Sequence, residues 1–297
     1  MSVVEEKLPE RPARRDHIPL GIFYMLAATV MFAGSSALSK WQVVTYPIGE
    51  VLFVRTLTSL ALCALLILPA AGLAVFRTQR PRDHLMRGFA QASSQTFIII
   101  AFSLMPLAGA VAINFSSPLF ATLVSAIVLK EAVGAARWGV LIVGFLGVVI
   151  VAVPGADTFQ LGALFALANA VIYGSVTAAV RGMTATESAE TLTIYQMVVL
   201  TVIFSAFLPF GFVTPTPGDA ALMAVNGAAN ALGQYWWTRA LHLAPASAVA
   251  PFFYFSLVWA IIIGFAVWGD VPTVGLLIGS AIVVCSGLFL LLRESRR

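Results

Sequence analysis

Charge is scarce in this 297-residue chain. Only 10% of its residues are Asp, Glu, Lys or Arg, whereas 60% are hydrophobic and the mean hydropathy is +0.96. Soluble domains carry about 25% charged residues, so this composition excludes a water-soluble globular protein. The sequence therefore predicts an integral membrane protein.

Cysteine and histidine are also rare. The 2 cysteines, Cys63 and Cys285, lie inside apolar stretches and predict neither a disulfide framework nor a metal site. The 3 histidines lie at the ends of apolar stretches, and no constellation of serine, histidine and acid is visible within them. We therefore expect no enzyme activity, no metal and no cofactor.

Long apolar runs are what the chain does contain. A run of about 20 residues can cross a hydrocarbon core of about 30 Å as a helix. The sequence holds ten such runs with short connections, which predicts an all-α membrane protein with ten transmembrane helices. The runs lie near residues 18–39, 47–69, 84–104, 106–129, 136–153, 160–181, 188–209, 218–241, 245–268 and 272–292.

The basic residues indicate the orientation. With ten spans both termini share one side, and nearly all Lys and Arg residues fall on that side, whereas the opposite side carries only Lys40. Positively charged loops are retained in the cytoplasm, so we expect cytoplasmic tails at residues 1–17 and 293–297 of a bacterial inner-membrane protein. The pI of about 9.3 then reflects topology, and no nucleic-acid partner is expected.

The chain repeats itself. Ala101, Leu104 and Pro106 recur 139 positions later as Ala240, Leu243 and Pro245, which predicts one five-helix unit written twice, at residues 18–155 and 156–292. Because five spans is an odd number, the second unit enters the membrane from the opposite side. Two inverted repeats create an interface that can open to either face, which suits a carrier.

These doubled motifs resemble the drug/metabolite transporter superfamily, specifically its ten-span branch with two EamA-type repeats. The acidic residues Glu131 and Asp270 after the fourth and ninth spans, and the glycines that follow them, carry the same resemblance. Within the superfamily the chain looks most like the YddG-type exporters of aromatic and other amino acids. The resemblance implies a substrate cavity between the third, fourth, eighth and ninth spans, joined by the first and sixth.

Amide side chains on single helix faces indicate the same region. In the eighth span, four polar or aromatic residues fall within an arc of about 80° around the helix. Two of its amide residues have counterparts 139 positions earlier, in the third span. They either line the cavity or form hydrogen bonds between helices that only hold the bundle together. The residues are Asn226, Asn230, Gln234 and Trp237 in the eighth span, and Gln91 and Gln95 in the third.

Prolines at corresponding positions interrupt the fourth and ninth spans, at Pro118 and Pro251. Interrupted helices in both halves of a transporter are a good sequence pointer to a binding site, although a simple packing kink is the alternative. The expected lining residues beside the breaks and in the sixth span are Asn114, Ser117, Tyr254, Asn169 and Tyr173.

Two charged residues, Glu50 and Arg55, lie inside the second span. Intramembrane charges are often functional, so Arg55 is a candidate contact for a substrate carboxylate and Glu50 a candidate for proton coupling. A structural role near the interface is the alternative. Glu131 and Asp270 are expected to end their helices, because the sequence identifies no cation that would make either of them a gate.

The expected cavity combines amides, hydroxyls and aromatic rings without a dense charge of either sign. Such a lining suits a zwitterionic amino acid better than a phosphate or a nucleotide sugar. The sequence therefore predicts a transporter that exports amino acids by alternating access. An exporter of drugs or other small metabolites is the alternative. The only other expected partner is the lipid bilayer, around a monomer or weak homodimer.

Overall fold

The computed structural model describes residues 17–128, 135–152, 157–183, 186–244, 249 and 252–294. Every regular element in these ranges is helical, and the predicted ten-span all-α architecture is confirmed. The helices are α1 (Ile18–Gln42), α2 (Ile48–Ala71), η1 (Gly72–Phe76), α3 (Pro81–Leu104), α4 (Leu107–Asn114), α5 (Ser117–Val128), α6 (Ala135–Ala152), α7 (Asp157–Met183), α8 (Ala189–Ser205), η2 (Leu208–Phe210), α9 (Pro217–Leu243), α11 (Phe255–Trp268) and α12 (Val274–Glu294).

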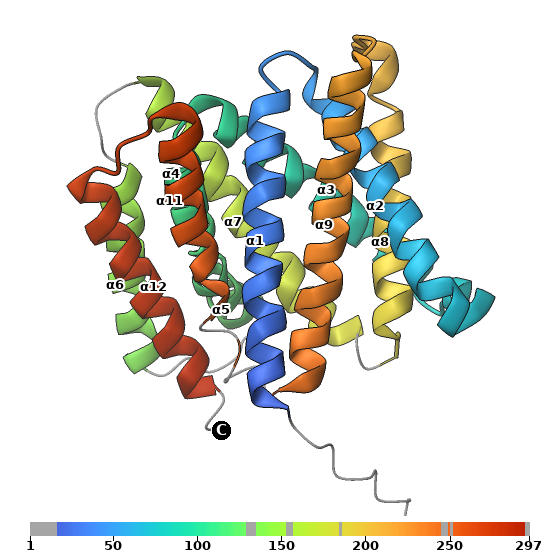
Figure 1. Cartoon of the computed structure of the whole chain (residues 1–297). Helices are drawn as coiled ribbons and strands as arrows, with labels where there is room; N and C mark the ends of the chain where they lie inside the picture. Colours follow the sequence, from blue (N-terminus) through green and yellow to red (C-terminus); the bar gives the residue numbers. More distant parts are fainter. Residues whose placement is uncertain are drawn as a thin grey trace, which may run out of the picture.

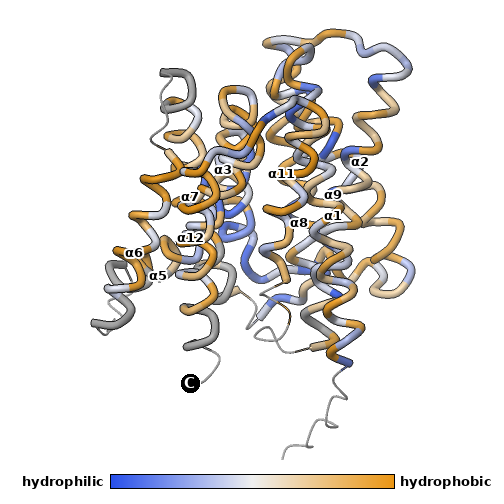
Figure 2. Tube along the Cα trace, turned by 60° about the vertical axis from the view of Figure 1, so that its left-hand side comes forward, coloured by the Kyte–Doolittle hydropathy of each residue, from blue (hydrophilic) through white to orange (hydrophobic). Residues whose placement is uncertain are grey.

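The helices differ in how apolar they are. Ile18–Gln42, Ile48–Phe76 and Ala189–Phe210 are long and apolar enough to cross a membrane by themselves, and α6, α11 and α12 contribute shorter apolar helices. The least hydrophobic of the described helices are α3 and α9, which carry the amide stripes. Figure 2 shows the apolar length of α6 and α12 and hydrophilic stretches toward the middle of the bundle.

Helix pairs organise the bundle. In Figure 1, α6 and α12 lie side by side at one edge, and α2 and α8 pack together at the opposite edge. Between these edges, α1 packs along α9 and α3 packs along α7. In chain order, α7 follows α1 by five spans and α9 follows α3 by five spans, so each central pair joins one helix of each half of the chain. The start of α1 and the end of α12 lie at the same end of the bundle (Figure 1).

Glycines permit the closest helix approaches. At the α6–α12 edge, a Cβ on Gly147 would lie 2.9 Å from the carbonyl oxygen of Gly279, and one on Gly279 would lie 2.7 Å from that of Gly147. On α9, a Cβ on Gly227 would lie 2.6 Å from the carbonyl oxygen of Arg55 on α2. These backbone contacts bring the facing helices together inside the chain.

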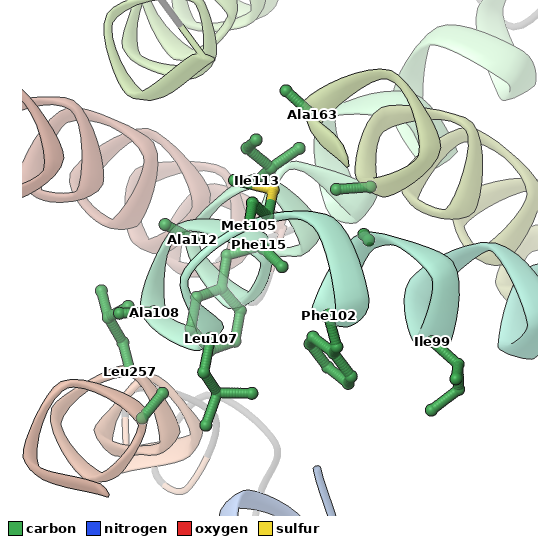
Figure 3. Packing of buried hydrophobic residues seen from close by; sticks show 14 of the residues in the cluster. Ile99, Phe102, Met105, Leu107, Ala108, Ala112, Ile113, Phe115, Ala163 and Leu257 are labelled. Atoms are coloured by element: carbon green, nitrogen blue, oxygen red, sulfur yellow. The ribbon is translucent and has the colours of Figure 1, made fainter. Parts of the chain in front are cut away.

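The largest buried apolar cluster surrounds α4, where α3, α7, α11 and α12 converge. Figure 3 shows Phe102 and Met105 at the end of α3 beside Leu107 and Ile113 of α4. Leu107 and Ile113 are completely buried. This close-packed core holds the first half of the fourth span in place and thereby positions the polar residues that follow it.

Several sequence-based expectations concern residues outside the described ranges. These are Pro251, Glu131 and most of the two tails. The fourth span, expected near residues 106–129 with an interruption at Pro118, consists of α4 and α5 with a break between them at Phe115 and Ser116.

Candidate functional site

The break in the fourth span lies at Phe115 and Ser116, and Pro118 is the second residue of α5. Proline lacks the N–H that would donate to the carbonyl of Asn114 in a continuous helix. The hydroxyl of Ser117 donates to that carbonyl instead, and the hydroxyl of Ser116 donates to the carbonyl of Ile113 at 2.6 Å. Side-chain hydroxyls therefore satisfy the backbone at the break.

A network of side chains joins the break to two other helices. Asn169 of α7 donates through Nδ2 to Oδ1 of Asn114 at 2.7 Å, and its own Oδ1 accepts from the hydroxyl of Ser94 on α3 at 2.6 Å. Gly174 lets α7 lie directly against the start of α5, because a Cβ there would be 2.5 Å from the carbonyl oxygen of Ser117. Three spans thus meet through polar contacts at the break.

A second polar network joins α9 to α1. Asn226 is completely buried, and it accepts from Ser35 at 2.6 Å through Oδ1. Its Nδ2 donates to Ser39 at 3.0 Å and to Gln42 at 2.9 Å. Both amide protons are used, so Asn226 matches the helix-joining alternative and leaves no donor for a ligand. Asn230, one turn further, donates to Ser59 of α2 at 3.2 Å.

Arg55 belongs to this second network. Its side chain points between α1 and α3, where Nη1 donates to the hydroxyl of Ser39 at 3.3 Å and Nη2 donates to Oε1 of Gln95. Arg55 is 7% exposed, and its Nε has no partner in the described part of the chain. A guanidinium is therefore held in the bundle interior by two neutral acceptors.

Glu50 does not pair with Arg55. It is completely buried in the first turn of α2, where Oε2 accepts from the backbone N–H of Val213 at 2.9 Å. Its other oxygen, Oε1, has no hydrogen-bond partner among the described residues. The carboxylate ties α2 to the connection that precedes α9, at the end of the bundle away from the described termini.

The remaining predicted residues lie in different surroundings. Gln91 is buried and Gln234 is half-buried, whereas Tyr173 is 42% exposed. Trp237 packs on the apolar cluster formed by Met25, Ala240 and their neighbours. Tyr254 is buried against Phe115 at 4.9 Å between ring centroids, and a Cβ on Gly287 would lie 3.1 Å from Cζ of its ring.

An aromatic cluster lies beside the break. Phe253 contacts Phe32 of α1 and Phe115, with ring centroids 6.1 and 5.9 Å apart. Gly233 of α9 makes room for Phe32, because a Cβ there would lie 2.9 Å from the ring. Phe32 and Phe253 are partly exposed, so they offer apolar walls next to the polar networks.

An ion pair that the sequence did not identify closes one end of the bundle. Lys40 Nζ at the end of α1 lies 3.8 Å from Asp270 Oδ2 and donates to the carbonyl of Met105 at 2.8 Å. The same ammonium lies 5.1 Å from the centroid of the Trp268 ring. Gly269, with φ of 69°, ends α11 and turns the chain so that Asp270 faces α1. Lys40 is thus the cation partner that Asp270 lacked in the sequence.

The opposite end has its own polar contacts. Glu187, between α7 and α8, accepts from the hydroxyl of Thr78 at 2.7 Å and lies 3.9 Å from Nε2 of His84. The hydrogen bond from Thr78 is the main cause that lowers the pKa of Glu187 below its ordinary value. Arg87 of α3 donates to the carbonyl of Leu192 at 3.1 Å and to Gln196.

Two surface hollows lie away from these networks. One, of about 260 Å³, is lined by Val148, Ala152, Ala163, Leu164 and Leu167, and the other, of about 350 Å³, lies between α6 and α12. Neither includes a predicted polar residue. Leu164 is 63% exposed, which places the first hollow on the apolar outer flank.

Comparison with known proteins decides the family. The model of the EamA-like transporter family matches the chain twice, over residues 19–153 and 160–293. This chain belongs to that family. As an EamA-like transporter it is a multi-pass membrane protein that moves small metabolites, and the expectation that it is no enzyme is confirmed.

Relatives with assigned substrates span most of this EamA-like chain. A riboflavin transporter of Rhizobium johnstonii is 30% identical, with coverage of 94% of this chain and 93% of the relative. An S-adenosylmethionine uptake transporter of Rickettsia bellii is 27% identical (93% and 95%), and a pseudopaline exporter of Pseudomonas aeruginosa is 28% identical (91% and 95%). A crystal structure with a TM-score of 0.64 and 20% identity covers 92% of this chain and 97% of its own, and supports the fold alone.

Sequence reasoning missed four polar residues that the structure brings into the second network, namely Ser35, Ser39, Gln42 and Ser59. The first three recur at intervals of four and three in α1, which is the helical spacing that marks one face. That pattern was readable. Ser59 had no such signal, because its role depends on how α2 crosses α9.

Proposed function

We propose that this EamA-like protein exports amino acids, aromatic and other neutral ones, from the bacterial cytoplasm by alternating access. The observation that carries the proposal is the break between α4 and α5, where Asn114, Ser117 and Asn169 gather polar groups beside the rings of Phe32 and Phe253. Discontinuous helices with such groups form substrate sites in transporters. A polar head and an apolar side chain both find matching surfaces there.

Alternating access requires two units that move against each other. We infer two inverted five-helix repeats, residues 18–155 and 156–292, with both termini in the cytoplasm. The two separate family matches support this division, as do the counterpart pairs α1–α9 and α3–α7. The concentration of Lys and Arg on the side of the termini supports the orientation.

In the proposed transport cycle, the Lys40–Asp270 pair closes the outer end of the helix bundle. It joins the end of α1 to the end of α11, and the Met105 carbonyl adds the start of α4. In the proposed orientation this end faces away from the cytoplasm. Export then requires the three spans to separate there, with loss of an ion pair that has only partly exposed side chains.

Counterflow in proteoliposomes tests the proposal. Purified protein should exchange radiolabelled phenylalanine, and Asn169→Ala should lower that rate about tenfold by removing two hydrogen bonds at the break. Ser175→Ala is the matched control, because Ser175 lies on the same helix and its hydroxyl donates to the carbonyl of Val171 within that helix. If phenylalanine and other neutral amino acids do not move, amino-acid export is wrong.

A second candidate is a carrier of other small metabolites on the same scaffold. The names of the relatives favour it, since they specify riboflavin, S-adenosylmethionine and pseudopaline. Counterflow with labelled riboflavin and labelled S-adenosylmethionine, run beside phenylalanine, separates the two candidates. Amino-acid export predicts the fastest exchange with phenylalanine.

A further inference from the structure

We propose that Arg55, supported by Gln95 and Ser39, forms the subsite that binds the carboxylate of the transported molecule. The inference rests on the proposed transport of amino acids and specifies the group that the protein selects. It makes Arg55 a specificity-determining residue, which favours carboxylates over neutral metabolites of similar size.

The first argument is uncompensated charge. In the described ranges the ion pairs are Lys40–Asp270, Arg80–Asp83 and His84–Glu187, and none of them involves Arg55. Glu50, the acid nearest in sequence, is bound to the backbone of Val213. A buried guanidinium held only by a hydroxyl and an amide carries a large desolvation penalty, which a bound anion would offset.

The second argument is donor capacity. A guanidinium has five N–H groups in a planar fork that matches both oxygens of a carboxylate. Arg55 donates one bond each to Ser39 and Gln95, and its Nε has no partner in the described part of the chain. Gln95 accepts through Oε1, so its own NH₂ group adds donors beside the fork.

The third argument is the apolar surface nearby. Phe32 precedes Ser39 by seven residues on α1, which places both on one face at a separation of about 10 Å along the helix. Phe32 contacts Phe253, which contacts Phe115 at the break. A small amphiphile with its carboxylate at Arg55 would lay its side chain toward these rings.

The position of Arg55 differs from that of an arginine that anchors a helix at the membrane interface. It follows the start of α2 by seven residues, about 10 Å into the bundle, and its partners lie on α1 and α3. Side chains that snorkel reach toward the interface and keep their charge in water. The 7% exposure of Arg55 is inconsistent with that role.

The test compares substrates that differ only in the acid group. Labelled phenylalanine and phenylalaninamide, and S-adenosylmethionine and its decarboxylated form, are offered to wild-type protein in proteoliposomes, with riboflavin as a neutral probe. Wild type should favour the carboxylate within each transported pair about tenfold or more. Arg55→Gln should remove that preference, and Arg55→Lys should keep part of it because the charge remains. Arg87→Gln, which changes a half-buried arginine outside the subsite, should retain it.

The outcomes separate the two proposals. Equal transport of phenylalanine and phenylalaninamide by wild type overturns the carboxylate subsite and leaves amino-acid transport standing. Carboxylate-dependent transport of S-adenosylmethionine without phenylalanine transport supports the subsite and overturns amino-acid export. Riboflavin as the only transported probe, or an Arg55→Gln protein that keeps the preference, also overturns the subsite. Size-exclusion chromatography of each variant controls for misfolding.

Discussion

Arg55 and Arg87 both lie in the second turn of their helices, yet their surroundings differ. Each donates to a glutamine side chain, Gln95 or Gln196, and each leaves Nε without a partner in the described ranges. The second acceptor of Arg87 is the carbonyl of Leu192, part of a helix backbone that cannot rotate away. Arg55 instead uses the hydroxyl of Ser39, which can turn toward another partner.

Under the proposed carboxylate subsite, this difference separates an arginine that joins two helices from one that binds substrate. Arg87 is half-buried and joins α3 to α8. Arg55 is buried more completely, and its hydrogen-bond partners lie on α1 and on α3, which carries the amide of Gln95. Two guanidiniums with the same number of hydrogen bonds can therefore have different functions, decided by whether their acceptors are fixed.

Removal of each positive charge in turn should give the largest difference between the two arginines. Arg55→Gln should lower phenylalanine counterflow about tenfold to a hundredfold, since a hydrogen bond to a charged group contributes about 1.5–3 kcal/mol. Arg87→Gln should change that rate less than about threefold while it lowers the melting temperature in detergent. Equal losses of transport in the two variants would show that both arginines serve the same role.

Two glycines at helix crossings provide a second test of the difference between the arginines. A Cβ on Gly227 would lie 2.6 Å from both the carbonyl oxygen of Arg55 and Cβ of Thr58, whereas one on Gly88 would lie 2.2 Å from Cγ1 and 2.9 Å from Cβ of Val199. Gly227→Ala should destabilise the protein by about 1–3 kcal/mol, because backbone must move. It should also weaken transport by displacing Arg55.

Gly88→Ala is the matched variant on α3. It should destabilise the protein to a similar extent, because Cβ of Val199 moves only with its backbone, and should leave transport unaffected because the contact does not involve Arg55. Thermal unfolding in detergent and counterflow measure the two effects. A transport defect in Gly88→Ala equal to that of Gly227→Ala would contradict the special place of Arg55.

The Lys40–Asp270 ion pair predicts a smaller effect. Asp270→Asn removes an interaction worth about 1 kcal/mol or less, which should raise exposure of the interior toward that side by up to about fivefold. Labelling of Asn114→Cys by an impermeant maleimide, with Cys63 and Cys285 replaced by alanine, measures the exposure. Asp219→Asn is the control, because Asp219 at the same end binds Tyr46 without joining α1 to α11. Unchanged labelling in Asp270→Asn would refute the closed end.

The smallest predicted effect concerns pH at the opposite end. The Thr78 hydrogen bond lowers the pKa of Glu187 below its ordinary value of 4.5, so the ionised carboxylate stabilises the fold above pH 4.5. That stabilisation is lost as the pH falls through the folded-state pKa. Glu187→Gln should flatten the acid decline of the melting temperature, measured between about pH 6 and pH 3.5. An identical decline in both proteins would exclude this contribution.

Helix number and position were largely predictable because membrane thickness sets the length of an apolar run. The end of α3 at Leu104 coincides with the predicted end of the third span. The break in the fourth span was harder to locate, because Pro118 indicates that the helix is disrupted but not at which residue. The chain breaks at Phe115 and Ser116, since proline is well accommodated in the first turn of the following helix.

Long-range partners in the site were not predictable. Lys40 and Asp270 are separated by 230 positions, and only the packing of α1 beside α11 brings them together. The face of the eighth span illustrates the same difficulty. Its amides were placed on one stripe, yet Asn226 bonds to α1 and Asn230 to α2, because two neighbouring helices share that face. Whether an amide joins helices or meets a ligand depends on those crossings.

The hydroxyls of Ser116 and Ser117 affect the step in which the unloaded transporter reorients across the membrane. These hydroxyls donate to the carbonyls of Ile113 and Asn114, so these two backbone acceptors at the break are satisfied without a bound substrate. We therefore expect the unloaded form to reorient across the bilayer, so that net efflux proceeds without compulsory exchange for a second solute.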